Sequence, residues 1–172
     1  MRKVKAKSVD LIVTSPPYWD VKDYKTKDQV GFKEPYSEYL SRISKIFKEC
    51  YRTLKDDRFF IVNINTITRK KKLIPIPLDF IEICKTFNLN LIEIVYWHKS
   101  SAIPSKFKFS DHFEYFLIFT KGNGRLLENK TFNTYKTNLK LNKPNIWKIN
   151  KKFGNIGKKY MSHPALFPIE YI

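Results

Sequence analysis

The sequence predicts an α/β protein, and two observations support this class. Short apolar, β-rich runs alternate with longer segments whose apolar residues recur every three or four positions, as in strands connected by helices. The chain has 172 residues, of which 42% are hydrophobic, enough for one domain with a substantial core. The sequence contains no internal repeat.

The first elements are a strand, a loop and a long helix. Residues 9–14 form an apolar run and are predicted to be a buried strand, whereas residues 20–35 are polar and predicted to be a loop. Ser37 is the expected N-cap of the helix that follows. The apolar stripe of this helix is formed by Leu40, Ile43, Phe47, Cys50, Tyr51 and Leu54.

The next elements continue the alternation. Strands are predicted over residues 59–64, 89–97 and 112–120, because these runs are rich in β-branched and aromatic residues. A basic loop, Arg69 to Lys72, leads to a short helix expected over residues 78–87. Contact with phosphate and a solvated loop are equally good interpretations of this basic run.

The composition changes after Gly122-Asn123-Gly124, which is predicted to be a turn. Residues 125–160 are rich in Lys, Asn and Thr, and both a DNA-facing insertion and a loosely ordered linker fit them. Residues 161–172 are predicted to begin a helix, with Pro168 in its first turn. We therefore divide the sequence into residues 1–124, 125–160 and 161–172.

The charge is strongly basic. Lys and Arg number 33 against 16 Asp and Glu, a formal net charge of +17, which points to a polyanionic partner. Aromatic residues make up 16% of the chain, and basic residues interleaved with aromatic ones suit unstacked bases. A Lys-rich genome would explain much of the same charge, so the charge by itself does not identify the partner.

The two cysteines and the lack of export signals indicate the cellular compartment of the protein. Cys50 and Cys84 fit neither a metal motif nor a disulfide framework, so buried free thiols in a reducing cytosol are expected. The sequence shows no signal peptide and no apolar run approaching the roughly 20 residues of a membrane helix. We expect a cytoplasmic protein without membrane contact and without a metal site.

The segment Asp10 to Trp19 is the most informative part of the chain. An apolar strand stops at a Ser, two prolines and two aromatic residues. Because prolines have a fixed φ and no N–H, this segment can hold the neighbouring hydroxyl, carbonyl and rings in one geometry. Such an arrangement suits a flat ligand with polar edges, such as a nucleobase. The alternative is an ordinary Pro-rich turn, with Tyr18 and Trp19 as core or rim aromatics.

Thr14-Ser15-Pro16-Pro17-Tyr18-Trp19 resembles the catalytic motif of amino-group DNA methyltransferases of restriction–modification type, in the form common among cytosine-N4 enzymes. The resemblance implies a Rossmann-like S-adenosylmethionine-dependent methyltransferase fold with a mixed sheet and flanking helices. It extends over nearly the whole chain through Leu54-Lys55-Asp56-Asp57, Trp97-His98-Lys99, His112-Phe113-Glu114-Tyr115, Ile146-Trp147-Lys148-Ile149 and His163-Pro164-Ala165-Leu166-Phe167-Pro168.

The resemblance also implies roles for individual residues. Ser15 and the Pro16 carbonyl would accept hydrogen bonds from the amine of a flipped base, Pro17 would complete the catalytic elbow, and Tyr18 would stack on the base. Ser15 in place of Asp favours cytosine N4 as the target, with adenine N6 left open. The S-adenosylmethionine pocket would be lined by Thr14, His163, Pro164, Ala165, Phe167 and Pro168.

Contacts with double-stranded DNA are expected from one aromatic residue and from lysines of the region 125–160: Trp19, Lys140, Lys143, Lys148, Lys151 and Lys152. Asn63 and Asn65 lie at a strand end, on the edge where α/β sites cluster, although a role in the pocket is not the favoured interpretation. His98 and His112 are expected to be structural.

One departure from the family is the glycine-rich cofactor loop, whose pattern matches none of the five glycines. The fold is therefore expected to be incomplete, and three explanations remain: a split enzyme completed by a second polypeptide that carries this loop, a truncated product, or a DNA-binding remnant without activity. A cognate restriction endonuclease would be a further partner. An RNA-modifying enzyme, or a structural protein with an accidental motif, is a less favoured alternative.

Overall fold

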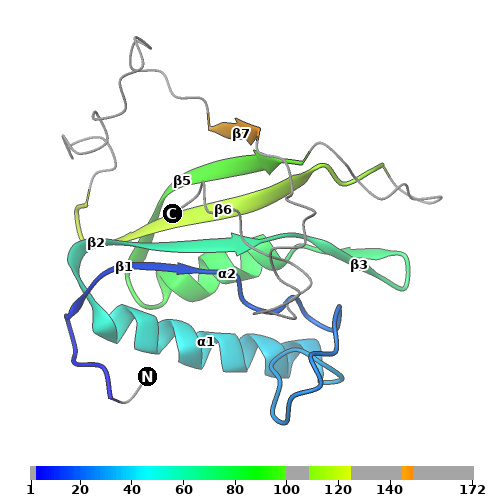
Figure 1. Ribbon diagram of the computed structural model, residues 1–172, viewed down its shortest axis with the longest axis horizontal. Helices are drawn as coiled ribbons and strands as arrows, with labels where there is room; N and C mark the ends of the chain where they lie inside the picture. Colours follow the sequence, from blue (N-terminus) through cyan, green and yellow to red (C-terminus); the bar gives the residue numbers. More distant parts are fainter. Residues whose placement is uncertain (1–2, 100–108, 125–144, 149–172) are drawn as a thin grey trace, which may run out of the picture.

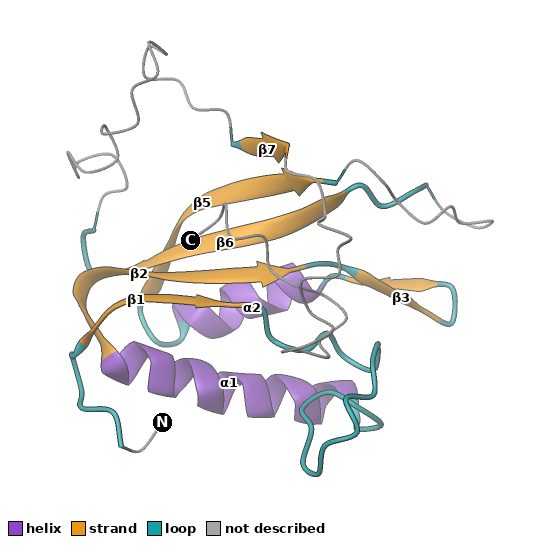
Figure 2. Ribbon diagram, viewed as in Figure 1, coloured by secondary structure: helices purple, strands orange, loops and turns teal. Residues whose placement is uncertain are grey.

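The computed structural model describes residues 3–99, 109–124 and 145–148, which form one mixed sheet with two helices on one face (Figure 1; Figure 2). The strand order is β1-β2-β6-β5-β7. The outer pairs β1–β2 and β5–β7 are parallel, and the inner pairs β2–β6 and β5–β6 are antiparallel. The five strands are β1 (Val9–Thr14), β2 (Leu54–Ile64), β5 (Leu89–His98), β6 (Phe113–Lys121) and β7 (Ile146–Lys148). The predicted α/β class with a mixed sheet is confirmed.

Helix α1 (Tyr36–Thr53) confirms the predicted long helix and most of its apolar stripe. Two details of the prediction are wrong. The N-cap is Pro35 rather than Ser37, because Pro35 has extended backbone (φ −56°, ψ 146°) and places Ser37 inside the first turn. Leu54 is not helical but begins β2 in extended conformation, so the strand starts five residues before the predicted Phe59.

The predicted basic loop is a β-hairpin formed by β3 (Ile67–Arg69) and β4 (Lys72–Ile74). Its two turn residues, Lys70 and Lys71, have φ of 47° and 62°, where a hairpin turn ordinarily has Asn and Gly. The sequence lacks this turn signature, and the hairpin was therefore missed. Helix α2 (Ile76–Lys85) follows and begins two residues before the predicted start, with Pro77 in its first turn.

The main core lies between the two helices and one face of the sheet. Phe47 of α1 makes edge-to-face contacts with Phe60 of β2 and Phe80 of α2, at centroid distances of 5.0 and 5.1 Å. Cys50 and Cys84 are buried free thiols in this core, as predicted. The opposite face carries a smaller apolar cluster of Val95, Trp97, Phe116 and Ile118, against which Trp147 packs.

Strand β7 lies within the stretch 125–160 that the sequence assigned to a DNA-facing region. Its residues pair in parallel with β5, Trp97 opposite Trp147, so part of this stretch belongs to the same sheet as the motif predicted to be catalytic. The remaining residues of 125–160, and all of 161–172, lie outside the described residues.

The segment Gly122-Asn123-Gly124 is a bend after β6, as predicted. The Asn123 N–H donates to Asp57 Oδ1 at 2.7 Å. A Cβ on Gly124 would lie 2.5 Å from Thr120 Oγ1, so this glycine permits close packing of the chain on itself. Within the described residues, neither helix is both long and apolar enough to cross a bilayer.

Candidate active site

The motif predicted to be catalytic lies where β1 ends. Strand β1 stops at Thr14, since the prolines that follow Ser15 have no N–H with which to continue the ladder. The Tyr39 hydroxyl of α1 donates to the Pro17 carbonyl at 3.0 Å and fixes the elbow on the helix. Ser15 is exposed at this edge. Because β1 and β2 are parallel and Thr14 pairs with Val62, the carboxyl ends of both strands meet here.

Asn63 of β2 determines the direction of the hydrogen bond made by Ser15. Its Nδ2 donates to the Tyr115 carbonyl at 3.3 Å, and this carbonyl can only accept. The Oδ1 of Asn63 therefore faces Ser15 and accepts from the Ser15 hydroxyl, also at 3.3 Å. The hydroxyl proton is thus directed into the protein. The lone pairs of Ser15 Oγ remain available to an outside N–H donor.

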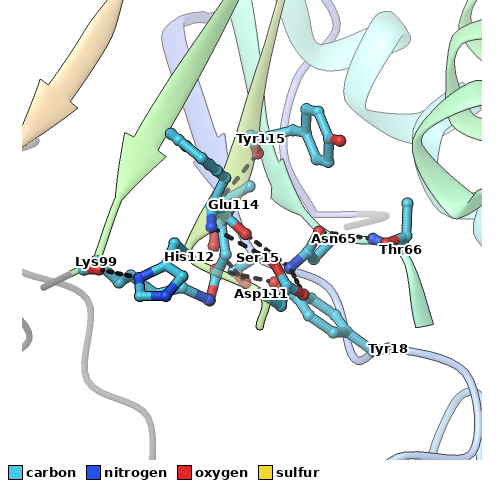
Figure 3. A network of polar contacts seen from close by, with 11 residues as sticks. Ser15, Tyr18, Asn65, Thr66, Lys99, Asp111, His112, Glu114 and Tyr115 are labelled. Atoms are coloured by element: carbon cyan, nitrogen blue, oxygen red, sulfur yellow. Dashed lines mark hydrogen bonds and ion pairs between the residues drawn. The ribbon is translucent and has the colours of Figure 1, made fainter. Parts of the chain in front are cut away.

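Tyr18 is held through its hydroxyl by two buried charges. The hydroxyl donates to Glu114 Oε2 at 3.0 Å, and the Lys99 ammonium donates to Glu114 Oε1 at 3.0 Å (Figure 3). The side chains of Lys99 and Glu114 are only 8% and 15% exposed. Burial, and secondly the Glu114 carboxylate, raise the pKa of Tyr18 well above its ordinary value, so the phenol stays protonated and donates.

A second group of polar contacts joins the ends of β2, β5 and β6. The Asn65 amide donates to Asp111 Oδ2 and to the Phe113 carbonyl, both at 2.8 Å. The Lys99 N–H donates to the His112 carbonyl at 2.7 Å. These hydrogen bonds hold the backbone on both sides of Glu114. The carboxylate that accepts from Tyr18 therefore lies on a strand end whose position is fixed.

The two histidines predicted to be structural stack on each other. The rings of His98 and His112 are 5.9 Å apart at an interplanar angle of 12°. His112 Nδ1 lies 3.3 Å from the Lys99 carbonyl oxygen. In the described ranges, His, Cys, Asp and Glu form no cluster of three or more that could hold a metal ion.

The residues predicted to contact DNA are found in different settings. The Trp19 indole N–H donates to the Glu34 carbonyl at 2.9 Å, and its ring lies 5.0 Å from that of Tyr36, so much of this side chain serves the fold. Lys148 is exposed on β7. A DNA contact by either residue stays a prediction. Lys140, Lys143, Lys151 and Lys152 lie outside the described residues.

Sequence reasoning missed the roles of Lys99 and Glu114, although both fall in segments that carried the family resemblance. One signal was present: each is a charged residue beside aromatic residues at a strand end, Lys99 directly after β5 and Glu114 near the start of β6. A buried charge there requires a partner, but the sequence did not reveal that the two partners are each other. Asn63 was considered and not favoured, yet it makes the contact with Ser15.

The predicted S-adenosylmethionine contacts fall almost entirely outside the described residues. Thr14 is the one predicted cofactor contact among them, and His163, Pro164, Ala165, Phe167 and Pro168 lie outside the described residues. The described glycines serve other purposes. A Cβ on Gly31 would meet the Tyr39 ring at 3.1 Å, and one on Gly122 would meet Asp57 Oδ1 at 2.6 Å. Both glycines therefore permit close packing within the fold.

Comparison with solved structures shows an α/β methyltransferase fold. PvuII DNA methyltransferase (cytosine-N4-specific) superimposes with a TM-score of 0.70 at 22% identity, covering 99% of this chain and 63% of that one. The DNA modification methylase TTHA0409 of Thermus thermophilus, complexed with S-adenosyl-L-methionine, superimposes with a TM-score of 0.59 at 21% identity. The match covers 86% of this chain and 63% of that one.

The family itself follows from the sequence comparison. A model of the DNA methylase family matches residues 9–172, and the chain therefore belongs to this family. Among relatives, the type II methyltransferase M.MwoI of Methanothermobacter wolfeii is 32% identical over 136 residues, 76% of this chain and 20% of that protein. M.MjaVI of Methanocaldococcus jannaschii is 31% identical over 94 residues, which are 55% of this chain and 47% of that protein. The chain thus matches between a fifth and about half of the length of these relatives.

Proposed function

We propose that this chain holds the target base for methyl transfer from S-adenosylmethionine to an exocyclic amine of double-stranded DNA. The observation that carries the proposal is the hydrogen bond from Ser15 to Asn63, which directs the Ser15 lone pairs away from the protein. Family membership and the methyltransferase fold support it.

The chemistry requires acceptors rather than a strong base. The lone pair of an exocyclic amine is delocalised into the ring, which makes the nitrogen a poor nucleophile. Two acceptors that hold its N–H groups would turn that lone pair toward the methyl donor. Ser15 Oγ is one, and the Pro16 carbonyl, to which none of the described residues hydrogen-bonds, is the second. Pro17 contributes through its rigid backbone.

Tyr18 would form the wall on which a flipped base stacks. Flipping costs a few kcal/mol of unstacking, and an aromatic surface in the pocket offsets part of that cost. Because the hydroxyl of Tyr18 donates to Glu114 and its ring packs against the main core, the side chain is held in one position. A ring already held in place loses less conformational freedom when the base arrives.

Within this proposal, cytosine N4 is the favoured target. Ser15 is a weaker acceptor than Asp, and the solved structure with a TM-score of 0.70 is a cytosine-N4-specific enzyme. Adenine N6 and a DNA-binding remnant without activity are the alternatives. The methyl-donor loop would come from sequence beyond these 172 residues, in the same or a second polypeptide. A cognate restriction endonuclease would be a functional partner rather than part of the site.

The test compares Ser15→Ala with a matched surface variant, Ser41→Ala, on the exposed side of α1. Each variant is combined with a polypeptide carrying the glycine-rich loop, and labelled methyl incorporation into DNA is measured. Ser15→Ala is expected to lower incorporation by about 10²-fold or more while non-specific DNA binding stays unchanged. Ser41→Ala should behave as wild type.

Equal loss of methyl incorporation and of DNA binding in Ser15→Ala would contradict the proposal, because it would show that Ser15 stabilises the fold instead of holding the base.

Nucleoside analysis of the methylated DNA by mass spectrometry separates N4-methylcytosine from N6-methyladenine. If the combined chains never transfer a methyl group but bind DNA, the remnant alternative is favoured.

A further inference from the structure

The β3–β4 hairpin lies directly beside the candidate site. It begins two residues after Asn65, whose amide belongs to the polar contacts of the site, and it extends past the carboxyl end of β2 (Figure 1). Its basic residues, Arg69 to Lys72, are followed by no acidic residue before Asp79 and preceded by none after Asp57. The side chains at 70, 71 and 72 are exposed.

The hairpin is also anchored to the catalytic elbow. Ile67 is 7% exposed and packs in the main core, which fixes the base of the hairpin. An Arg69 guanidinium nitrogen lies 3.6 Å from a carboxylate oxygen of Asp20, the residue next to Trp19. The base of the hairpin is therefore fixed in the core and connected by an ion pair to the residue that follows the Ser-Pro-Pro-Tyr-Trp segment.

The turn of the hairpin places two lysines next to each other at its tip. Lys70 and Lys71 both adopt left-handed backbone conformations, which Asn and Gly accept more readily, and Lys7, Lys25 and Lys33 also have positive φ in this fold. The backbone conformation therefore does not set these two lysines apart; their exposed place at the tip, next to the candidate site, does. Lysines also protect exposed strand edges from pairing with other chains, but that role belongs to residues within the strands rather than to the turn.

We propose that the β3–β4 hairpin binds the DNA backbone next to the flipped base, with the ammonium groups of its tip on phosphates. This inference rests on the proposed function, since it assumes that Ser15 faces a base drawn from a duplex. A compact ammonium on a flexible stem suits a phosphate, whose position varies little with base sequence. The hairpin would thus hold the duplex in place without reading its sequence.

The sharpest test replaces the tip by the turn that hairpins favour. Lys70→Asn combined with Lys71→Gly removes two charges and also relieves the left-handed lysines, so the melting temperature should stay equal or rise. The control, Lys45→Gln with Lys48→Gln, removes two exposed charges from α1. Binding of the full chain to a DNA duplex is measured by fluorescence anisotropy over a range of salt concentrations.

The tip variant is expected to lower DNA affinity by about tenfold or more near 0.1 M salt and to reduce the salt slope by about two. The α1 control should change both much less. Equal effects of the two variants, or an unchanged slope in the tip variant, would overturn the proposal. That failure is distinct from failure of the proposed function, which shows itself in Ser15→Ala as unchanged methylation or as equal loss of methylation and of DNA binding.

Discussion

Two buried lysines, Lys99 and Lys121, lie at opposite ends of the antiparallel pair β5–β6 and serve different purposes. Lys121 is 5% exposed, and its ammonium donates to the carbonyls of Tyr51 and Leu54 at 2.9 and 2.7 Å. The same ammonium lies 4.4 Å from the centroid of the Tyr51 ring. Lys99 is 6% exposed and pairs with Glu114, which in turn accepts from Tyr18.

The difference lies in what the partners of each lysine hold in turn. The backbone carbonyls that accept from Lys121 belong to the junction of α1 and β2, so this lysine closes the connection between a helix and a strand. The Lys121 ammonium also lies 3.4 Å from Asp56 Oδ1, but Asp56 is largely exposed and its other oxygen pairs with the surface residue Lys7.

The Glu114 carboxylate, which accepts from Lys99 through one oxygen, accepts from Tyr18 of the candidate site through the other. A buried lysine therefore does not by itself indicate a functional site. What points to one at Lys99 is that its partner, Glu114, also binds Tyr18.

The largest effect on stability is expected from Glu114→Gln. This change leaves the Lys99 ammonium buried without a carboxylate, which should lower the free energy of unfolding by about 3 kcal/mol. Chemical denaturation measures the change. The double variant Lys99→Met with Glu114→Gln should recover most of the loss, because no uncompensated charge remains. A double variant as unstable as the single one would show that Glu114 does not act through Lys99.

The matching change at the other end of the sheet is Lys121→Met. It removes the donor of two buried carbonyls, with an expected loss of about 2 kcal/mol in the free energy of unfolding. Methyl incorporation at a temperature where the variant remains folded should equal that of wild type. A loss of methyl incorporation in folded protein would contradict the purely structural role assigned to Lys121.

Asn63→Leu tests the direction of the Ser15 hydroxyl. Without the Asn63 acceptor, the hydroxyl is free to turn its proton outward, and methyl incorporation is expected to fall about tenfold, or roughly 1.4 kcal/mol in the transition-state free energy. Non-specific DNA binding should not change, because the buried Asn63 has no access to a duplex. An unchanged rate of incorporation would show that Ser15 orients itself without Asn63.

The smallest effect concerns pH and the buried thiol of Cys50. Burial raises the pKa of Cys50 from 9.0 to about 11, so the folded protein binds the thiol proton more tightly than the unfolded chain does. Its contribution to stability is fully present below pH 9 and is lost as the pH rises toward 11. Between about pH 8 and pH 10 the free energy of unfolding should fall by about 1 kcal/mol through this group. In Cys50→Ala this part of the decline should disappear, and a decline as steep as in wild type would assign it to other groups.

Local patterns predicted the positions of several elements. The stripe of α1 and the runs of β1, β5 and β6 were predicted to within a few residues, because periodicity and β-rich runs report where an element lies. The prediction that residues 9–14 form a buried strand is wrong in one respect: β1 lies at one end of the described sheet, and none of its six residues is buried. Strand β7 was not predicted. It has three residues and becomes a strand because β5 offers an edge for it to pair with.

The sequence by itself determined the class of this protein: a basic α/β chain with a Ser-Pro-Pro-Tyr segment at a strand end, similar to the amino-group DNA methyltransferases. The tertiary structure decided which groups complete the site. Ser15 and Asn63 are 48 positions apart, and Tyr18 and Glu114 are 96 apart. The pairing of β1, β2 and β6 brings these strand ends to one edge, and this pairing depends on packing across the whole sheet, which no local pattern encodes.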